Sequence, residues 1–394
     1  MARTQVQINP RILEWARIRA HYSQDGLAKK IPVSLEIYRK WEAGEGRPTI
    51  TQLYKLVLAL RRPLQTFFLD NPPEEREILR EMRRLPGVTS GEESPELALQ
   101  VQQTLERREI ALRLYEDLGE QPPRITLRAH TEEDPEGIGS ELRTGLGIGI
   151  ELQQSWREPY AALRAWRSAL ENLGALVFQV PKVSMQEMRG FSISVDPLPI
   201  IGFNSDDSPR GRIFTLLHEL GHILLRDSIL HSPRDGWFQI DPSIETEQFC
   251  NNLAGAVLVP AGDLLAHAGS VGKRSNDVWV DSEIGSLSSR YQVSRAVIIR
   301  RLRKLQLVSL DSYEELRQEY DNFEPELQAA GSGGDFYATK LSHMGTLLPQ
   351  LAFRTYYDNK LTTSGLSSIL GLKVRHLGRL EERLFGRKYA FQRS

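Results

Sequence analysis

The apolar run Phe214–Leu225 carries three ionisable side chains within five residues, and this combination constrains the chain more than any other feature. The run holds no proline, so we expect a helix on which His218 and His222, four residues apart, share one face. Two neutral imidazoles at this spacing suit zinc, and Glu219 between them is placed to accept a proton from water at the metal. The spacing is therefore typical of a zinc-dependent peptidase.

The alternative interpretation is a buried helix with two hydrogen-bonded core histidines, and a third metal ligand would argue against it. Residues 243–260 predict a second helix that a proline ends. Glu247 and Asn251 lie four residues apart on one face, so Glu247 could complete a set of two histidines and one glutamate, with Asn251 supporting the ligands from behind. Glu245 is a competing carboxylate, and an acidic first turn that complements the helix dipole would explain both residues.

These two segments together resemble the ImmA/IrrE metallopeptidases, soluble bacterial and phage enzymes that cleave transcriptional repressors. The resemblance rests on Phe214–Leu225 and on Glu247, Asn251, Ala254, Leu258 and Pro260. It implies that His218, His222 and Glu247 bind Zn²⁺ and that Glu219 is the catalytic carboxylate. Cys250 and Leu253 stand where alanine and phenylalanine are usual, and as apolar exchanges both are expected to leave the metal unaffected.

The composition is that of an ordinary soluble globular protein. The chain has 394 residues, of which 40% are hydrophobic and 26% charged, and its formal net charge is −1. This length allows two or three domains. We find no signal peptide and no apolar run of about 20 residues that would span a bilayer, and one cysteine excludes an internal disulfide. We therefore expect a cytoplasmic protein without a membrane partner.

Residues 8–70 predict five short helices. Ser23 can cap a helix that begins at Gln24, and Ser34 can cap the next, which ends near Glu42. This pattern resembles the helix-turn-helix of Xre/Cro-type regulators, which implies that Gln24 contacts a phosphate and that the third helix faces DNA. The residues expected to face the groove are Leu35, Glu36, Ile37 and Lys40. Because the usual arginine, asparagine or glutamine readers are missing, a helix-turn-helix that binds protein is the alternative.

We expect an α+β fold that is mainly helical. The predicted domains are a five-helix helix-turn-helix domain at 1–70, a charged helical linker at 71–123, a zincin-like metallopeptidase domain with a small sheet at 124–265, a helical segment at 266–330 that resembles a helix-turn-helix, and a basic helical C-terminal domain at 331–394.

Three strands are predicted in the peptidase domain, at 175–180, 191–195 and 199–204. The second and third are candidates for an edge along which an extended substrate would lie. The long loop before Glu247 could shape substrate access, and His231 within it could stabilise an oxyanion, although a solvated loop histidine is the favoured interpretation of that residue.

A second basic region follows the peptidase domain. Residues 281–305 again predict helix, turn and helix, and the second of these helices is rich in arginine. This charge suggests nucleic acid or an acidic partner, whereas a solvated helix face is the alternative.

The sequence therefore predicts a zinc endopeptidase fused to a helix-turn-helix module. Its expected partner is a protein substrate, by resemblance a transcriptional repressor, and DNA is a second candidate partner. The rival hypothesis is a DNA-binding regulator or antitoxin whose metallopeptidase-like domain senses or docks without catalysis. The presence of Glu219 argues against this rival, because a purely structural metal site has no use for a general base.

Overall fold

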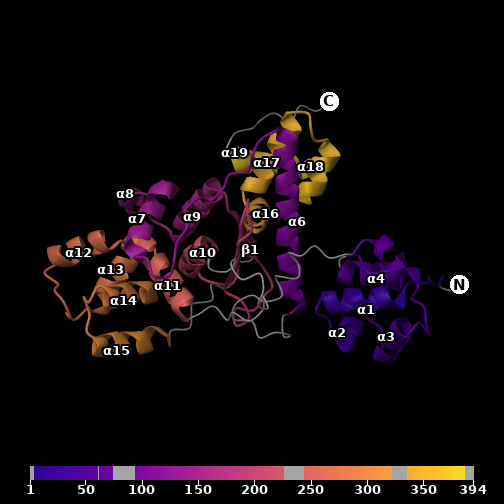
Figure 1. Ribbon diagram of the computed structural model, residues 1–394, viewed down its shortest axis with the longest axis horizontal. Coiled ribbons are helices and arrows are strands. Elements are labelled where there is room, and N and C mark those ends of the chain that lie inside the picture. Colours follow the sequence, from indigo (N-terminus) through magenta and orange to yellow (C-terminus); the bar gives the residue numbers. More distant parts are fainter. Residues whose placement is uncertain (1–3, 61, 74–93, 226–243, 322–334, 387–394) are drawn as a thin grey trace. The chain divides into compact units, whose positions relative to one another are not determined.

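The protein is mainly helical with one small sheet, as predicted (Figure 1). The computed structural model describes residues 4–60, 62–73, 94–225, 244–321 and 335–386. The chain divides into two compact units, Met1–Gln103 and Thr104–Ser394. The predicted loop with His231 and part of the predicted linker lie outside the described residues.

The first unit is a bundle of short helices around one apolar core. Ser23 and Ser34 cap their helices as expected, each hydroxyl accepting a bond from a backbone N–H three residues on. The fifth predicted helix is a 3-10 helix. The core is formed by Leu13, Leu27, Tyr38, Trp41 and Leu56, all at most 3% exposed. The elements are α1 (Pro10–Arg19), α2 (Gln24–Lys30), α3 (Leu35–Glu42), α4 (Ile50–Leu60) and η1 (Leu64–Phe68).

Four described helices lie between the first bundle and the sheet along the chain. They are α6 (Pro95–Leu118), α7 (Pro135–Leu146), α8 (Ile150–Ser155) and α9 (Pro159–Leu173). The part of α6 that belongs to the second unit carries Arg108, a buried side chain that donates hydrogen bonds to the carbonyls of Pro197 and Leu198. Since these carbonyls lie in the turn before the last strand, α6 holds the turn of the sheet in place.

The sheet has three strands in the order β1-β3-β2, with bounds β1 (Leu176–Val180), β2 (Gly190–Ile193) and β3 (Ile200–Asn204). β3 pairs in parallel with β1 and antiparallel with β2. Phe191 of β2 lies across Gly202 of β3, where a Cβ would meet its ring at 2.4 Å. The expectation that residues 199–204 form an edge strand is therefore wrong, because β3 is hydrogen-bonded on both sides. β2 pairs on one side only within the described part of the chain, and it remains the candidate.

The next six described helices along the chain, α10 to α15, share one apolar core with α7 and α9. A buried polar network joins them: Arg143 of α7 donates to the Val257 carbonyl, Gln153 of α8 donates to the carbonyls of Leu258 and Tyr291, and Arg301 donates to the Val259 carbonyl. The helices are α10 (Pro209–Leu224), α11 (Ile244–Leu258), α12 (Ala261–Ser270), α13 (Asp281–Tyr291), α14 (Arg295–Lys304) and α15 (Leu310–Asp321).

Within this part of the second unit, three arginines of residues 281–305 form ion pairs with carboxylates of the fold. Arg301 is 3% exposed and pairs with Glu136, Arg290 pairs with Asp263, and Arg295 pairs with Asp281. Two of the basic side chains of α14, Arg295 and Arg301, are thus paired within the fold, whereas Arg300 and Lys304 are exposed.

The C-terminal helices of the second unit pack on β1 through α16 (Figure 1). Glu171 of α9 is 3% exposed, pairs with Arg167 and accepts a hydrogen bond from the Thr346 backbone N–H. The helices are α16 (Phe336–Met344), α17 (Leu347–Tyr357), α18 (Thr363–Leu370), the 3-10 helix η3 (Val374–His376) and α19 (Leu377–Phe385).

In the described part of the chain, no single helix is long and apolar enough to cross a bilayer. Glu245–Leu258 and Ala261–Ser270, which meet at a bend of 57°, pass that test together on length and composition alone.

Candidate metal centre and helix-turn-helix surface

Two helices that pack unusually closely bring the predicted metal ligands together. α10 begins after Ser208, whose hydroxyl accepts a hydrogen bond from the Gly211 N–H, and it runs through the apolar segment as predicted. A Cβ at Gly221 would lie 3.0 Å from the sulfur and 3.2 Å from the Cα of Cys250 in α11. Gly221 is therefore required for the close approach of the helices, which carries Glu247 to the histidine face of α10.

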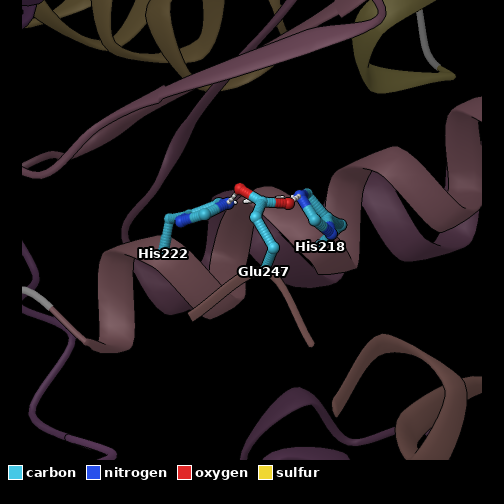
Figure 2. Close-up of side chains that lie close together, drawn as sticks. All are labelled: His218, His222 and Glu247. Atoms are coloured by element: carbon cyan, nitrogen blue, oxygen red, sulfur yellow. Dashed lines mark hydrogen bonds and ion pairs between the residues drawn. The ribbon is translucent and has the colours of Figure 1, made fainter. Parts of the chain in front are cut away.

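The side chains of His218, His222 and Glu247 converge on one point (Figure 2). The Nε2 atoms of the two histidines are 3.1 Å apart. One carboxylate oxygen of Glu247 lies 3.4 Å from Nε2 of His218, and the other lies 3.2 Å from Nε2 of His222. The three ligand atoms lie within 4.8 Å of one another, which places two nitrogens and a carboxylate around one small space.

This donor set fits zinc. Two imidazoles and one carboxylate are a known catalytic zinc set that leaves a coordination position open. Burial and then the charge of His222 lower the pKa of His218 to about 4. Burial also lowers the pKa of His222, but Cys250 and Glu247 outweigh it and raise that pKa to about 10. The site formed by His218, His222 and Glu247 therefore favours one positive charge between the three side chains, and a metal cation would supply such a charge.

Glu219 lies between α10 and the edge strand. It is 8% exposed, and a Cβ added to Gly190 of β2 would lie 2.9 Å from its Oε1 atom. Burial raises the pKa of Glu219 to about 7, although His222 and the hydroxyl of Ser192 act in the opposite direction. A carboxyl group with this pKa can both accept and donate a proton near neutral pH. The glycine in β2 is what lets the carboxyl group lie against the strand.

The remaining predicted residues of this site take different positions. Asn251 is exposed, and a hydrogen bond from its side chain acts to raise the pKa of His218, so it lies next to that candidate ligand. Nδ1 of His218 is nevertheless buried without a partner of good hydrogen-bond geometry among the described residues. Glu245 is exposed and does not belong to the ligand group.

Three further residues contribute to the site that the sequence did not single out. Gly190 and Ser192 contact Glu219 from β2, and the Cys250 thiol interacts with His222. Cys250 was expected only as an apolar exchange. Its position three residues after Glu247 on the same helix is the signal that could have placed it beside the ligands.

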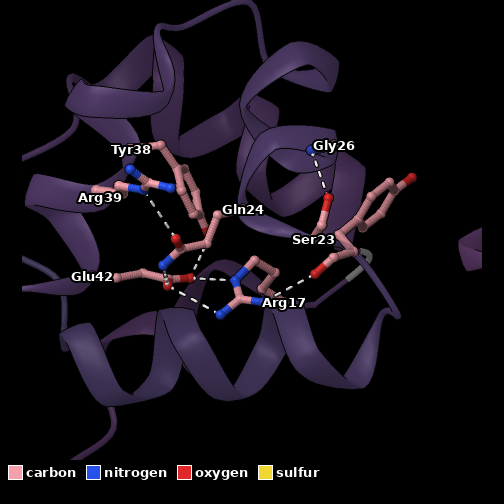
Figure 3. A network of polar contacts seen from close by, with 8 residues as sticks. Arg17, Ser23, Gln24, Gly26, Tyr38, Arg39 and Glu42 are labelled. Atoms are coloured by element: carbon pink, nitrogen blue, oxygen red, sulfur yellow. Dashed lines mark hydrogen bonds and ion pairs between the residues drawn. The ribbon is translucent and has the colours of Figure 1, made fainter. Parts of the chain in front are cut away.

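In the first unit, the helix-turn-helix is organised around the buried carboxylate of Glu42 (Figure 3). Arg17 donates to both of its oxygens at 2.7 and 3.1 Å, and the Tyr38 hydroxyl donates at 2.7 Å. The Gln24 amide donates to it at 2.7 Å and accepts from Arg39 at 3.3 Å. Gln24 is therefore held in place by protein contacts at the position where a phosphate contact is expected.

The outer face of α3 is partly neutralised. Glu36, Ile37 and Lys40 are exposed and Leu35 is half-exposed, so the predicted groove-facing residues do reach the surface. Glu36 and Lys40 form an ion pair at 2.8 Å, however, which cancels their charges. Arg39 is also exposed beside them. It was not predicted, although its spacing of three and four residues from Glu36 and Leu35 places it on the same face.

Comparison with known proteins identifies a domain family in each of these two regions. Residues 171–303, which include the three converging side chains and Glu219, match the peptidase family model described as the IrrE N-terminal-like domain. Residues 13–67 match the family model described as Helix-turn-helix. A search of the curated proteins finds no match to the chain. The predicted combination of an N-terminal helix-turn-helix with a metallopeptidase-like domain is confirmed.

Proposed function

The chain carries the two domains of an ImmA/IrrE protein with an N-terminal Xre-type helix-turn-helix, and on this basis we propose that it is a zinc-dependent endopeptidase acting on a transcriptional regulator. The observation that carries the proposal is the convergence of His218, His222 and Glu247, with the next residue after His218 being a buried carboxyl group of raised pKa. A structural metal site would need the first three residues and would gain nothing from the fourth.

Each residue has a defined task in this proposal. His218, His222 and Glu247 hold the metal from two helices that are locked together at Gly221. Bound zinc would supply a Lewis acid that activates water and polarises the peptide carbonyl. Glu219 accepts the proton of the attacking water and returns it to the leaving amine, for which a pKa of about 7 is well suited.

The edge strand supplies the binding surface for the substrate. Among the described residues β2 is hydrogen-bonded only to β3, and its Gly190 and Ser192 lie against Glu219. An extended peptide that adds to the free edge of β2 would be held by backbone hydrogen bonds beside the general base. Backbone recognition does not select a sequence, so the choice of substrate falls to other surfaces, of which the helix-turn-helix domain is the first candidate.

The proposal is tested by incubating the metal-loaded protein with purified helix-turn-helix repressors from the same genome. We expect fragments of a repressor with wild type, none after chelation, and none with Glu219→Gln although that variant keeps its zinc. Glu245→Gln is the matched control, because it removes an exposed acid from the same helix as Glu247 and should leave cleavage unchanged.

Other outcomes would point elsewhere. Fragments of the protein itself, with the repressors intact, would indicate a self-cleaving regulator. Full zinc occupancy without any cleavage would support the sensing or docking domain instead, and cleavage by Glu219→Gln at the wild-type rate would refute the role given to that residue.

A further inference from the structure

Three helix-turn-helix hairpins occur in the described part of the chain, and one hydrogen bond aligns them. In each, a backbone N–H in the turn donates to the carbonyl five residues earlier: Val33 to Ala28, Val293 to Ser288, and Leu372 to Ser367. The hydroxyls of Ser288 and Ser367 also both donate to the carbonyl of that turn residue. The pairs α2–α3, α13–α14 and α18–α19 therefore share one turn geometry.

The third hairpin has the complete pattern of a helix-turn-helix. Gly371, which ends α18, adopts the left-handed conformation with φ of 56°, as Gln292 does at the end of α13 with φ of 55°. The positions that face the core are apolar and buried, and α17 and α16 pack against them. These core residues are Leu366, Leu370, Leu372, Leu377 and Leu380, all at most 7% exposed. α17, α18 and α19 thus form a three-helix unit of the kind that presents its last helix to DNA.

The outer faces of the second helices differ. In α14, Ile299 is 2% exposed and α15 packs against the helix, so this face is covered. The aligned position in α19 is Gly378, where a Cβ would meet no atom within 4 Å in the described part of the chain. In α3 the aligned position is Arg39, beside the neutralised pair of Glu36 and Lys40. Only α19 and α3 therefore present an outer face to solvent.

The outer face of α19 and η3 carries a positive charge that nothing in the described residues neutralises. Lys373, Arg375 and Arg379 are exposed, and no carboxylate lies within ion-pair distance of them in the described ranges. Arg375 occupies the position of Glu36 in α3, and Arg379 that of Lys40. In α3 the two side chains at these positions carry opposite charges that cancel, whereas the two aligned side chains of η3 and α19 are both positive. Val374, 49% exposed, lies among these cations.

We propose that the C-terminal unit α17–α19 is a second DNA-binding module, which takes duplex DNA against η3 and α19. Lys373, Arg375 and Arg379 would contact phosphates and base edges, and Gly378 between them lets the helix backbone approach closely. Val374 offers an apolar contact of the kind made with thymine methyl groups. The geometry favours DNA over an acidic protein, because the cations stand on the outer face of the second helix of a complete helix-turn-helix.

The test measures binding of the full-length zinc-loaded protein to a fluorescent 30-base-pair duplex of random sequence over a series of salt concentrations. Arg375→Glu/Arg379→Glu removes two phosphate contacts, so we expect at least tenfold weaker binding at low salt and a salt slope smaller by about 2. The same loss is expected in a background carrying Arg39→Glu/Lys40→Glu, in which the first helix-turn-helix is disabled. Arg375→Lys/Arg379→Lys should retain binding.

The matched control is Arg300→Glu/Lys304→Glu, which reverses two exposed charges at the same spacing on the covered hairpin and should leave binding within twofold of wild type. Equal losses in both pairs would overturn the proposal in favour of diffuse charge attraction. It would also fail if Arg375→Glu/Arg379→Glu bound like wild type, or if the chain with the disabled first module bound no duplex at low salt. Circular dichroism and melting temperature verify that each variant is folded.

Discussion

At the scale of single residues, Glu247 separates a metal site from a pair of neighbouring histidines. Without Glu247, the Nε2 atoms of His218 and His222, which are 3.1 Å apart, would interact only with each other through one shared proton. With it, a hydrogen bond from His222 lowers the pKa of the Glu247 carboxyl group, so the carboxylate is ionised when a cation arrives. The ligand set therefore depends on one side chain from the second helix.

Glu247→Ala is expected to weaken zinc binding more than about 100-fold, since loss of a direct ligand should exceed the 10–100-fold cost of losing a group behind a ligand. Metal titration with a competing chelator measures this. Glu245→Ala, two residues earlier and exposed, should bind zinc like wild type. Equal affinities for the two variants would assign the third ligand to another residue.

The raised pKa of Glu219 predicts how the metal-free protein responds to pH. Between its ordinary value of 4.5 and about 7, the carboxyl group is protonated in the native state and ionised in the unfolded state. The native state then binds more protons, so its stability falls as pH rises through this range. In chelator, Glu219→Gln should gain up to about 3 kcal/mol of unfolding free energy over wild type from pH 5 to 7.5.

Denaturant melts of both proteins across that range test the effect. Because the histidines are present in both, the difference isolates Glu219. Parallel stability curves would show that the carboxyl group titrates at its ordinary pKa.

The sequence pointed to the candidate residues of the site that lie on helices, with the exception of Cys250, and missed those whose contact with Glu219 depends on the sheet. A spacing of four residues is enough to pair His218 with His222, and helix periodicity points Glu247 and Asn251 the same way. Gly190 and Ser192 lie far from Glu219 along the chain, and the packing of α10 against β2 brings them close. Sequence periodicity holds no information about which strand neighbours which helix.

At the scale of elements, the distance between α10 and α11 decides whether the ligands meet. A methyl group at residue 221 would lie 3.0 to 3.2 Å from Cys250, partly from its backbone, which cannot move aside cheaply. Gly139 plays the same part between α7 and α11, where a Cβ would lie 3.1 Å from Ala256. α11 is therefore packed closely by glycines on two helices.

Gly221→Ala is expected to destabilise the protein by about 1–3 kcal/mol through overpacking and to lower its zinc affinity, despite the better helix propensity of alanine. Gly145→Ala in α7 is the control, because a Cβ there meets no atom within 4 Å among the described residues. That variant should be neutral or more stable by up to about 1 kcal/mol. Thermal melts with and without zinc compare the two, and an unimpaired Gly221→Ala would contradict the packing account.

The elements themselves were largely predictable, and their order in the sheet was not. Turn residues and apolar periods located all three strands and both site helices. The parallel pairing of β1 with β3 places the last strand at the centre, which reverses the expectation for residues 199–204. Nothing in a strand of buried residues such as Ile200 to Asn204 distinguishes a central position from an edge covered by a helix.

At the scale of the whole molecule, the two units have separate cores and separate sources of stability. The first depends on the buried Glu42 network, and the second contains the metal ligands. Whatever binds one unit should therefore stabilise that unit.

Differential scanning calorimetry should resolve two transitions. Glu42→Ala leaves Arg17 without its buried partner, so it should cost the first unit about 2–4 kcal/mol and lower one transition alone. Zinc should raise only the other transition, in wild type and in Glu42→Ala alike. One transition that responds to both changes would show that the units fold as a single cooperative block.

The ion pair of Arg167 with Glu171 sets a limit on how far the chain can be shortened. The residues that match the peptidase family begin at Glu171 itself, near the end of α9, and end at residue 303, before Thr346, which donates to its carboxylate. A fragment limited to those residues would lack Arg167, so Glu171 would lose its ion-pair partner. It would also lack Arg143 and Gln153, which donate hydrogen bonds to the carbonyls of Val257 and Leu258. The smallest fragment of this region worth expressing on its own therefore spans residues 104–386.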